Sequence, residues 1–315
     1  MCLMAFSLPA RPADGWMLAA NRDEALDRPT AALHRWLTPQ GTTVVAGRDL
    51  RDGGTWIGST PGGRVAMLTN VREPTSVAFA ASTQPDLRSR GELPTRWLDT
   101  QASQPNARQA AARFVAELAP QVHLFGGFNL VLGDIAQNHW LWINNRPELV
   151  MADLPAHIRV LARLTHAGLV VAELPPGVYG LSNAGLDTPW PKTIALRTAL
   201  AELASPHHPA RPPLDTHHPL WSVLANPATW PDADLPATGV PLDWERALSA
   251  IWVDKPSTTG ASGGYGTRTS LLMQATLQAA PPQAHPSSPH WQMDMLERTW
   301  RPAAQAGWAH QAWVV

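Results

Sequence analysis

The chain has 315 residues, of which 44% are hydrophobic and 16% are charged, a composition typical of a soluble globular protein. Its formal net charge of -1 gives no indication of a nucleic-acid partner or of an anionic membrane surface. A single cysteine excludes an intramolecular disulfide and a cysteine-rich metal site.

The sequence also bears on location. No apolar run is long enough to cross a bilayer, so we expect no membrane span. The first eight residues lack the basic segment of a secretory signal, and a turn cluster begins at Pro9. Since a single cysteine fits a reducing compartment, we expect a cytoplasmic protein.

Short strands are predicted in the first seventy residues. Apolar runs at 2–8 and 16–20 flank a turn cluster at 9–15, which predicts a hairpin with a long loop. Frequent glycines farther along indicate tight turns between further strands. These strands are expected at 43–46, 55–57 and 64–68.

Helical patterning follows. Apolar residues recur at helical spacing in 91–100 and 106–118, the latter through Ala111, Phe114 and Leu118. Later elements are expected as strands at 128–132 and 139–143, joined through Gly133-Asp134, helices at 192–203 and 243–251, and strands at 268–274, 291–296 and 308–314. Strands, then helices, then strands again favour layered α+β packing over alternating βαβ units.

The length of the chain allows two domains but also fits one large layered domain, and we expect a single domain over residues 1–315. Three stretches are expected to be surface insertions: polar residues 82–94, Pro- and His-rich residues 205–241, and Pro/Ala/Ser-rich residues 279–289. For the largest we expect a passive loop outside the core rather than a lid.

Cys2 is the strongest candidate for a catalytic residue. Initiator methionine is normally removed when the next side chain is small, which would leave a thiol and a free α-amine on one carbon. An α-amine has a pKa of about 8, so it can accept the thiol proton without a separate histidine base. The alternative is a buried cysteine that packs as a small hydrophobe, but the position of the sole cysteine favours an N-terminal nucleophile.

Four consecutive polar residues, Asn21-Arg22-Asp23-Glu24, follow the second predicted strand. The simpler interpretation is a solvated turn or the start of a helix. In a hairpin, however, this strand end would approach Cys2. A carboxylate there could orient the terminal ammonium, and an arginine could favour the thiolate.

Cys2 together with Asn21-Arg22-Asp23-Glu24 resembles the NRDE family, also called the transport and Golgi organisation protein 2 family. The resemblance continues through Gly53-Gly54-Thr55-Trp56-Ile57-Gly58, Leu68-Thr69-Asn70-Val71-Arg72, Gly180-Leu181-Ser182-Asn183-Ala184, Tyr265-Gly266-Thr267-Arg268-Thr269-Ser270 and Glu297-Arg298-Thr299. It implies the α+β fold of N-terminal-nucleophile hydrolases, a four-layer αββα sandwich with two stacked antiparallel sheets between helices. It implies less about the reaction, because eukaryotic relatives are linked to secretory organisation, lipid metabolism and haem handling.

A more distant resemblance, to bile-salt hydrolases and penicillin V acylases, implies roles for single residues. The residues that match the catalytic Asp, the two Asn and the late Arg of those enzymes are Asp23, Asn70, Asn183 and Arg268. Ala20 departs from the pattern, because those acylases have arginine there. Arg22 could substitute from a neighbouring position, but on a strand we expect it to point to the opposite face.

The chemistry of acyl transfer supports the two asparagines independently, because its intermediate needs preorganised donors for the oxyanion. Asn70 and Asn183 are amide donors in small, Gly-bordered segments where a substrate could approach. The alternative for each is an asparagine that caps a turn. Arg268 follows the glycine-rich residues 263–266, a loop that could bring it to the site or bind an anionic group.

Paired histidines raise the question of a metal site. His207-His208 and His217-His218 lie in the Pro-rich stretch without nearby paired carboxylates. We therefore expect neither a metal nor another cofactor.

These features predict a hydrolase or acyltransferase that acts on a linear amide or a thioester. Cys2 would attack the carbonyl carbon, and Asp23 would orient the α-amine. Asn70 and Asn183 would stabilise the oxyanion, while Arg268 would tune the local charge. The residues expected to contact the substrate are Asn21, Arg22 and Trp56.

The main alternative is a non-catalytic protein on the same fold. It would bind or traffic haem or an acyl lipid, with Cys2 as a thiolate ligand to the haem iron. The expected partner is therefore a small molecule: an amide, an acyl compound or haem. A scaffolding role would need an exposed apolar patch, which a sequence does not reveal.

Overall fold

The computed structural model describes residues 2–73, 87–103, 106–164, 168–205, 212–257, 263–278 and 290–315. Its strands form two sheets in which every pair of neighbouring strands is antiparallel. The first sheet has the order β11 (Gly177–Leu181), β1 (Cys2–Leu8), β2 (Trp16–Ala25), β13 (Tyr265–Gln278), β14 (His290–Thr299) and β15 (Gly307–Val314), with β12 (Asp254–Lys255) beside β13. The second sheet has the order β3 (Thr30–Leu37), β4 (Thr43–Asp49), β5 (Ile57–Ser59), β6 (Arg64–Asn70), β7 (Phe128–Asp134), β8 (His139–Asn144), β10 (Leu169–Glu173) and β9 (Arg159–Leu164).

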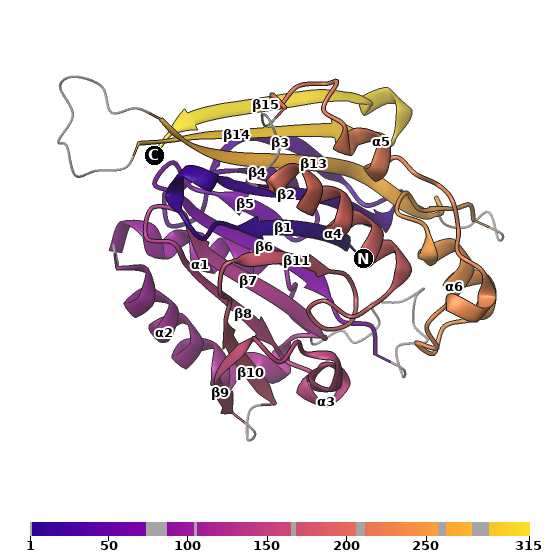
Figure 1. Ribbon diagram of the computed structural model, residues 1–315, viewed down its shortest axis with the longest axis horizontal. Coiled ribbons are helices and arrows are strands. Elements are labelled where there is room, and N and C mark those ends of the chain that lie inside the picture. The colour runs from indigo at the N-terminus through magenta and orange to yellow at the C-terminus, as the bar shows by residue number, and fades with distance from the viewer. Residues whose placement is uncertain are drawn as a thin grey trace.

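Helices cover the outer faces of both sheets (Figure 1). The second sheet carries α1 (Glu92–Ser103) and α2 (Ala107–Leu118), and the first sheet carries α4 (Pro191–Ala204) and α5 (Leu220–Leu224). The shorter helical segments are α3 (Pro147–Val150), α6 (Leu242–Ser249), η1 (Pro12–Asp14), η2 (Ala119–Leu124), η3 (Met151–Asp153), η5 (Asp232–Asp234) and η6 (Ala303–Gln305). Within the described ranges, no helix combines the length and the apolar character that crossing a membrane requires.

Three buried clusters of hydrophobic side chains fill the spaces between the layers. Residues of β1 alternate between two of them. Leu3 and Ala5 pack against the helices, whereas Met4 and Phe6 pack against the second sheet. Because both faces of β1 are buried, its sequence is a continuous apolar run. The predicted α+β fold with four αββα layers is confirmed.

Most of the predicted strands and helices are confirmed, with bounds that differ by a few residues. The difference that matters for the site is in β2, which continues to Ala25. Residues 21–24 are therefore part of this strand, and the expectation of a strand that ends at Ala20 was wrong. Gly133 and Asp134, predicted to join two strands, are the last residues of β7. The strands that the sequence patterns did not predict are β3, β9, β10, β11 and β12.

The Pro-rich stretch 205–241 does not lie wholly outside the core, contrary to expectation. It contains α5, whose residues Leu220, Trp221 and Leu224 are buried against the first sheet. These apolar side chains explain why part of a proline-rich segment packs on the sheet. Predicted insertion residues that lie outside the described ranges are 82–86, 206–211 and 279–289.

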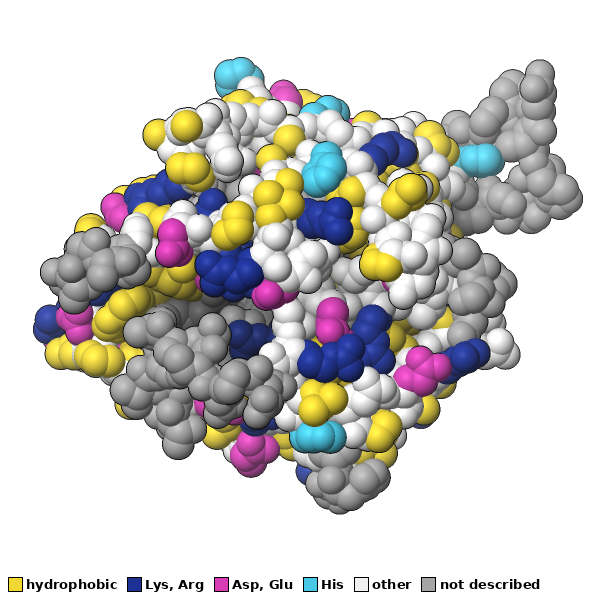
Figure 2. Space-filling model, turned by 180° about the vertical axis from the view of Figure 1, so that it is seen from behind, with side chains coloured by type: hydrophobic (Ala, Val, Ile, Leu, Met, Phe, Trp, Pro, Cys, Tyr) yellow, Lys and Arg dark blue, Asp and Glu magenta, His cyan; other side chains and the backbone are white. Residues whose placement is uncertain are grey.

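The face shown in Figure 2 carries basic and acidic side chains interspersed with hydrophobic ones. Exposed ion pairs elsewhere on the chain include Arg108 with Glu173 at 3.0 Å and Arg113 with Glu117 at 2.7 Å. Such solvated pairs contribute little to stability, so the fold depends mainly on the buried layers.

A tryptophan stack joins the two sheets at the end of β1 that is farther from Cys2. Trp140 of β8 stacks on Trp16 of β2, with ring centroids 5.5 Å apart and planes inclined by 11°. Its ring also covers Gly133, its ladder partner on β7. A Cβ atom at position 133 would collide with the Trp140 ring, so this contact requires glycine.

Replacing Gly133→Ala should lower the free energy of unfolding by about 1–3 kcal/mol, because Trp140 must leave its place between the sheets. The control is Gly307→Ala, where the nearest neighbour of the new Cβ is 4.0 Å away and a change within about 0.5 kcal/mol is expected. Urea unfolding, followed by near-UV circular dichroism, measures both. Equal unfolding midpoints for Gly133→Ala and the wild type would contradict the requirement for glycine.

Candidate functional site

Cys2 begins β1, and its side chain is 8% exposed. In the ladder with β2 it is paired with Arg22, so both side chains lie on the face of the first sheet that is turned toward the second sheet. Ser182, just after β11, donates a hydrogen bond of 3.1 Å to the Cys2 carbonyl oxygen. Burial raises the pKa of the Cys2 thiol, so the uncharged thiol is favoured at neutral pH.

Arg22 lies on the same face of β2 as Ala20, and the expectation of an opposite face was wrong. Residues two apart in a strand share a face. The Cζ atom of Arg22 is 4.3 Å from the ring centroid of Trp56, and an Nη atom is 3.4 Å from a carboxylate oxygen of Asp49. Both partners belong to the second-sheet side of the sandwich. Arg22 and Trp56, which were predicted to contact the substrate, thus contact each other between the sheets.

Asp23 points to the other face of β2, toward the helices. Its carboxylate accepts a hydrogen bond of 2.6 Å from Thr267, and its backbone carbonyl accepts one of 2.7 Å from the Tyr265 hydroxyl. Burial raises the pKa of the Asp23 carboxyl, while the positive charge of Lys192 acts against this shift. Arg22 is the ladder partner of Cys2, so the next residue along β2 carries this buried carboxyl group.

Lys192, which no sequence motif indicated, lies in the first turn of α4. Its ammonium group is buried and donates a hydrogen bond of 2.7 Å to the carbonyl oxygen of Leu248. Burial lowers the pKa of Lys192 to about 8, and the negative charge of Asp23 opposes this effect. The feature of the sequence that could have drawn attention to Lys192 is the rarity of lysine, since Lys192 and Lys255 are the only lysines in the chain.

The structure brings Asn70 and Asn183 together beside the start of β1. The Asn183 side-chain amide donates a hydrogen bond of 2.9 Å to the backbone carbonyl of Asn70, at the end of β6. Arg72 donates its backbone N–H to the Asn183 carbonyl at 2.8 Å. The side-chain amide of Asn70 makes no hydrogen bond with the described part of the chain. Counting partners in the described ranges alone, one amide N–H of Asn183 is thus occupied and both amide N–H groups of Asn70 are available.

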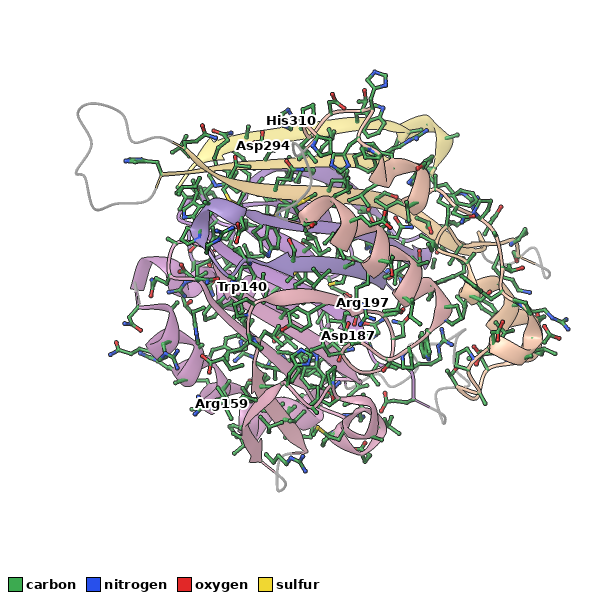
Figure 3. The ribbon with its side chains drawn as sticks, in the orientation of Figure 1. Trp140, Arg159, Asp187, Arg197, Asp294 and His310 are labelled. Carbon is green, nitrogen blue, oxygen red and sulfur yellow. The ribbon has the colours of Figure 1, made fainter. Side chains whose placement is uncertain are left out.

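The loop that carries Asn183 is held in place by Asp187, which Figure 3 labels together with Arg197 of α4. A carboxylate oxygen of Asp187 accepts a hydrogen bond of 2.6 Å from the Gly180 N–H and lies 3.0 Å from an Nη atom of Arg197. These contacts link the end of β11 to the helix layer. Asn183 is therefore positioned by a loop with fixed ends.

Two of the predicted site residues, Asn21 and Arg268, donate side-chain hydrogen bonds to backbone carbonyl oxygens. Asn21 faces the helices, where its amide donates to the carbonyl oxygens of Leu224 and Ile251, both at 2.8 Å. Arg268 is buried at a bulge in β13 and donates to the carbonyl oxygen of Ala25 at 3.1 Å. Burial lowers the pKa of Arg268, and its charge lies close enough to Arg22 for mutual repulsion. Both side chains fix the ends of neighbouring segments.

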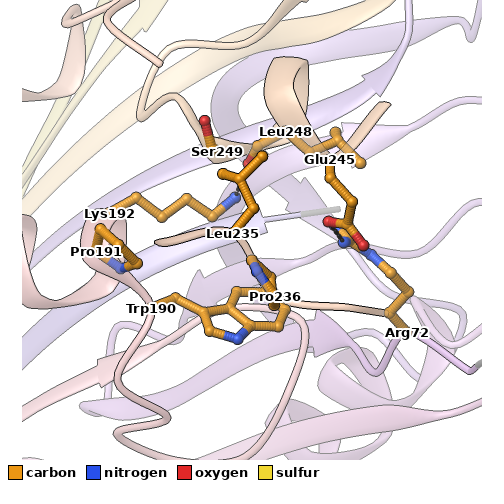
Figure 4. Close-up of a pocket in the computed structure, with 9 residues that line it drawn as sticks. All are labelled: Arg72, Trp190, Pro191, Lys192, Leu235, Pro236, Glu245, Leu248 and Ser249. Atoms are coloured by element: carbon orange, nitrogen blue, oxygen red, sulfur yellow. Dashed lines mark hydrogen bonds and ion pairs between the residues drawn. The ribbon is translucent and has the colours of Figure 1, made fainter. Parts of the chain in front are cut away.

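A small pocket of about 10 Å³ lies beside Lys192 (Figure 4). Arg72 and Glu245 form an ion pair of 3.0 Å in its wall. Leu235 and Pro236, from the Pro-rich stretch, also line it. This volume suffices for about one water molecule, so the Pro-rich stretch closes the region next to the Lys192 ammonium in this conformation.

Of the two histidine pairs, only His217-His218 lies in the described part of the chain, where no group of three or more His, Cys, Asp or Glu side chains could hold a metal ion. His218 is buried, and its Nδ1 atom accepts a hydrogen bond of 3.3 Å from the Leu220 N–H. Burial lowers the pKa of His218 to about 4, so the ring is neutral at physiological pH. His207 and His208 lie outside the described residues.

Glu297 is a second buried charged residue that was not predicted to belong to the site. It lies on β14 with Met293 and Met295, on the face turned toward the second sheet, and it is 1% exposed. One carboxylate oxygen accepts a hydrogen bond of 2.8 Å from the Leu33 N–H. Burial raises the pKa of Glu297 to about 7, against the effect of the Arg22 charge. Its position among apolar same-face neighbours was the signal that could have found it.

The chain matches the family model described as Transport and Golgi organisation 2 over residues 1–279. It is similar to the Transport and Golgi organization 2 homolog of Mus musculus, with 27% identity over 285 residues. It is also similar to the Transport and Golgi organization protein 2 homolog of Homo sapiens, with 29% identity over 283 residues. Each alignment covers 87% of this chain and 88% of the relative.

Two solved structures show a looser similarity. One is a Caenorhabditis elegans N-acylethanolamine-hydrolyzing acid amidase ortholog, with a TM-score of 0.40 and 11% identity over 86% of this chain and 92% of that chain. The other is the mutant C2A conjugated bile acid hydrolase from Clostridium perfringens, with a TM-score of 0.39 and 9% identity over 98% of this chain and 91% of that chain.

The carboxyl group of Glu297 should make stability depend on pH. Its pKa is raised from 4.5 to about 7 in the folded chain, so the folded state holds the proton more tightly than the unfolded state. The contribution of the protonated Glu297 carboxyl group to the free energy of unfolding is fully present below about pH 4.5. This contribution, on the order of 3 kcal/mol, is lost as the pH rises through about 7. Glu297→Gln keeps an acceptor for the Leu33 N–H but does not titrate. Its stability relative to the wild type should therefore rise between pH 5 and pH 8.

Urea unfolding at pH 5, 6, 7 and 8 measures this difference, with exposed Glu148→Gln as the control. A difference between Glu297→Gln and the wild type that stays constant with pH would show that the carboxyl group titrates normally.

Proposed function

The chain belongs to the Transport and Golgi organisation 2 family, and we propose that it is a hydrolase or acyltransferase in which Cys2, exposed by removal of Met1, is the N-terminal nucleophile. Its substrate is a linear amide or a thioester. The observation that carries the proposal is the position of the only thiol in the chain. It stands at the start of a buried strand, and its ladder partner immediately precedes the Asp23 carboxyl group.

Activation of the thiol needs an internal base. Burial raises the pKa of Cys2, which leaves little thiolate at neutral pH. Once Met1 is removed, the α-amine of the same residue has a pKa of about 8 and can accept the proton directly or through one water. The Asp23 carboxylate then favours the ammonium form of the amine, because opposite charges stabilise each other in a buried site.

The covalent steps follow from this arrangement. The Cys2 sulfur bonds to the substrate carbonyl carbon while its proton passes to the α-amine. The carbonyl oxygen becomes an oxyanion, for which the side-chain amide of Asn70 and the remaining N–H of Asn183 are the proposed donors. Collapse of the intermediate breaks the C–N or C–S bond, and the leaving amine or thiol takes the proton from the α-ammonium. Water, or an acceptor amine, then releases the acyl group from Cys2.

The first test compares the wild type with a form that carries one glycine between Met1 and Cys2. Both have the same thiol, but the α-nitrogen of Cys2 is an amide in the second form. We expect the intact mass of the wild type to lack Met1, and iodoacetamide near pH 7 to add one group rapidly. Turnover in a screen of N-acyl amides and acyl thioesters should fall by at least about 10³-fold in the glycine form and in Cys2→Ala.

Two outcomes would oppose the proposal. One is a wild-type protein that retains Met1 and has a slowly alkylated thiol. The other is turnover that survives in the glycine form. Either would remove the N-terminal-nucleophile mechanism, and haem or acyl-lipid binding would become the next candidate to measure.

Asp23→Asn should lower turnover by about 10²-fold at pH 7 while leaving removal of Met1 unchanged, because the amide cannot stabilise the α-ammonium. Asp232→Asn is the matched control, since Asp232 forms an exposed ion pair with Arg246. Steady-state kinetics from pH 6 to pH 9 measure both variants. Wild-type rates in Asp23→Asn across this range would exclude a role for the carboxylate.

A further inference from the structure

A second pocket, of about 50 Å³, lies between the sheets at the far end of β1 from Cys2. Its rim comes from the turn after β1 and from the turn between β7 and β8, and it includes Pro12 and Ala136, which are exposed. Its floor consists of Trp16, Trp140 and Trp291, all buried. The seven residues of β1 separate it from Cys2 by on the order of 20 Å.

The floor of this pocket is preformed. Trp140, labelled in Figure 3, stacks on Trp16 and lies against Gly133. Its indole N–H donates a hydrogen bond of 3.1 Å to the side chain of Asn138, which also lines the pocket. Asn138 has a φ of 43°, a left-handed conformation that is uncommon for a residue other than glycine. Tight packing and this turn therefore fix the orientation of the ring.

The other two tryptophans of the floor have unused donors. Trp16 and Trp291 are 1% and 3% exposed, and neither indole N–H has an acceptor in the described part of the chain. The buried indole N–H of Trp97 donates to the Val65 carbonyl at 2.9 Å, whereas those of Trp252 and Trp313, which do not line this pocket, also lack an acceptor in the described part of the chain. A buried donor without a partner destabilises the protein, so an acceptor supplied from outside would be favoured.

We infer that this tryptophan pocket binds a compact, uncharged group that joins an apolar body to a hydrogen-bond acceptor such as a carbonyl or hydroxyl oxygen. The unused polar groups on its lining side chains are donors, which select for an acceptor. No charged side chain lines it, and apart from Asn138 its walls are aromatic, aliphatic or proline. Its volume exceeds the roughly 10–15 Å³ that one water molecule requires on the same measure.

The inference does not depend on the proposed chemistry of Cys2. The two sites lie at opposite ends of β1 and share no residue. Alkylation of Cys2 should leave binding at the tryptophan pocket unchanged, so failure of one proposal does not decide the other.

The probes are cyclopentanone, which has a ring and a carbonyl acceptor, and cyclopentane, which has the ring alone. The full chain is labelled with ¹⁵N-tryptophan, and Trp16→Phe and Trp291→Phe assign the two indole N–H resonances. Cyclopentanone should shift both resonances saturably, and cyclopentane should not. Trp291→Phe should weaken cyclopentanone binding by about three- to ten-fold through loss of one hydrogen bond.

A rim variant and its control test the location. Ala136→Leu, at the exposed rim, should abolish the cyclopentanone shifts, whereas Ala303→Leu, exposed on η6, should leave them unchanged. The inference is overturned if the two resonances do not respond, or if Ala136→Leu binds cyclopentanone as the wild type does. In another outcome, the two indole N–H resonances have the chemical shifts of hydrogen-bonded groups without any probe and respond to neither probe. That result would also overturn the inference, since it would show that the cavity holds only water.

Discussion

Burial of β1 on both faces is the constraint on which the rest of the structure depends. Leu3, Met4, Ala5 and Phe6 are fully buried, so helices must cover one side of this strand and a sheet the other. Polar groups can enter such a strand only at its ends, and Cys2 stands at one of them. The same absence of solvent raises the pKa values of Cys2 and Asp23 and lowers that of Lys192. One physical cause therefore explains both the fold and the electrostatics of the site.

Charges inside the sandwich are held close to partners. Arg64 and Asp134 form a buried ion pair of 3.0 Å between β6 and β7, which are ladder neighbours at that point. Arg72 and Glu245 form another, which ties the segment after β6 to α6 beside the Lys192 pocket. A buried ion pair adds little net stability, but removal of one partner leaves an uncompensated charge. Separating either ion pair would therefore cost free energy, so the two pairs hold the segments around the site together.

Sequence patterns predicted the layers because strands buried on both faces are continuous apolar runs. They missed β3, where a bulge between Ala31 and His34 interrupts the alternation, and β9, whose residues alternate only between exposed and half-buried. Motifs selected Cys2 and Asp23 as candidates for the site. No motif included Lys192, and Glu297 was noted only within the family-like segment Glu297-Arg298-Thr299, because a charged residue acquires its character from neighbours that are distant in sequence. The face of Arg22 was predictable, since it lies two residues after Ala20.

The four polar residues of β2 belong to two different layers. Asn21 and Asp23 contact the helix side, whereas Arg22 and Glu24 lie on the side of the second sheet, 3.7 Å apart as an ion pair. Because alternate residues of a strand face opposite sides, inserting or deleting one residue within β2 would send each of them to the wrong layer. Changes in chain length are therefore better absorbed by the turns that flank β2, at residues 9–15 and 26–29, than within the strand.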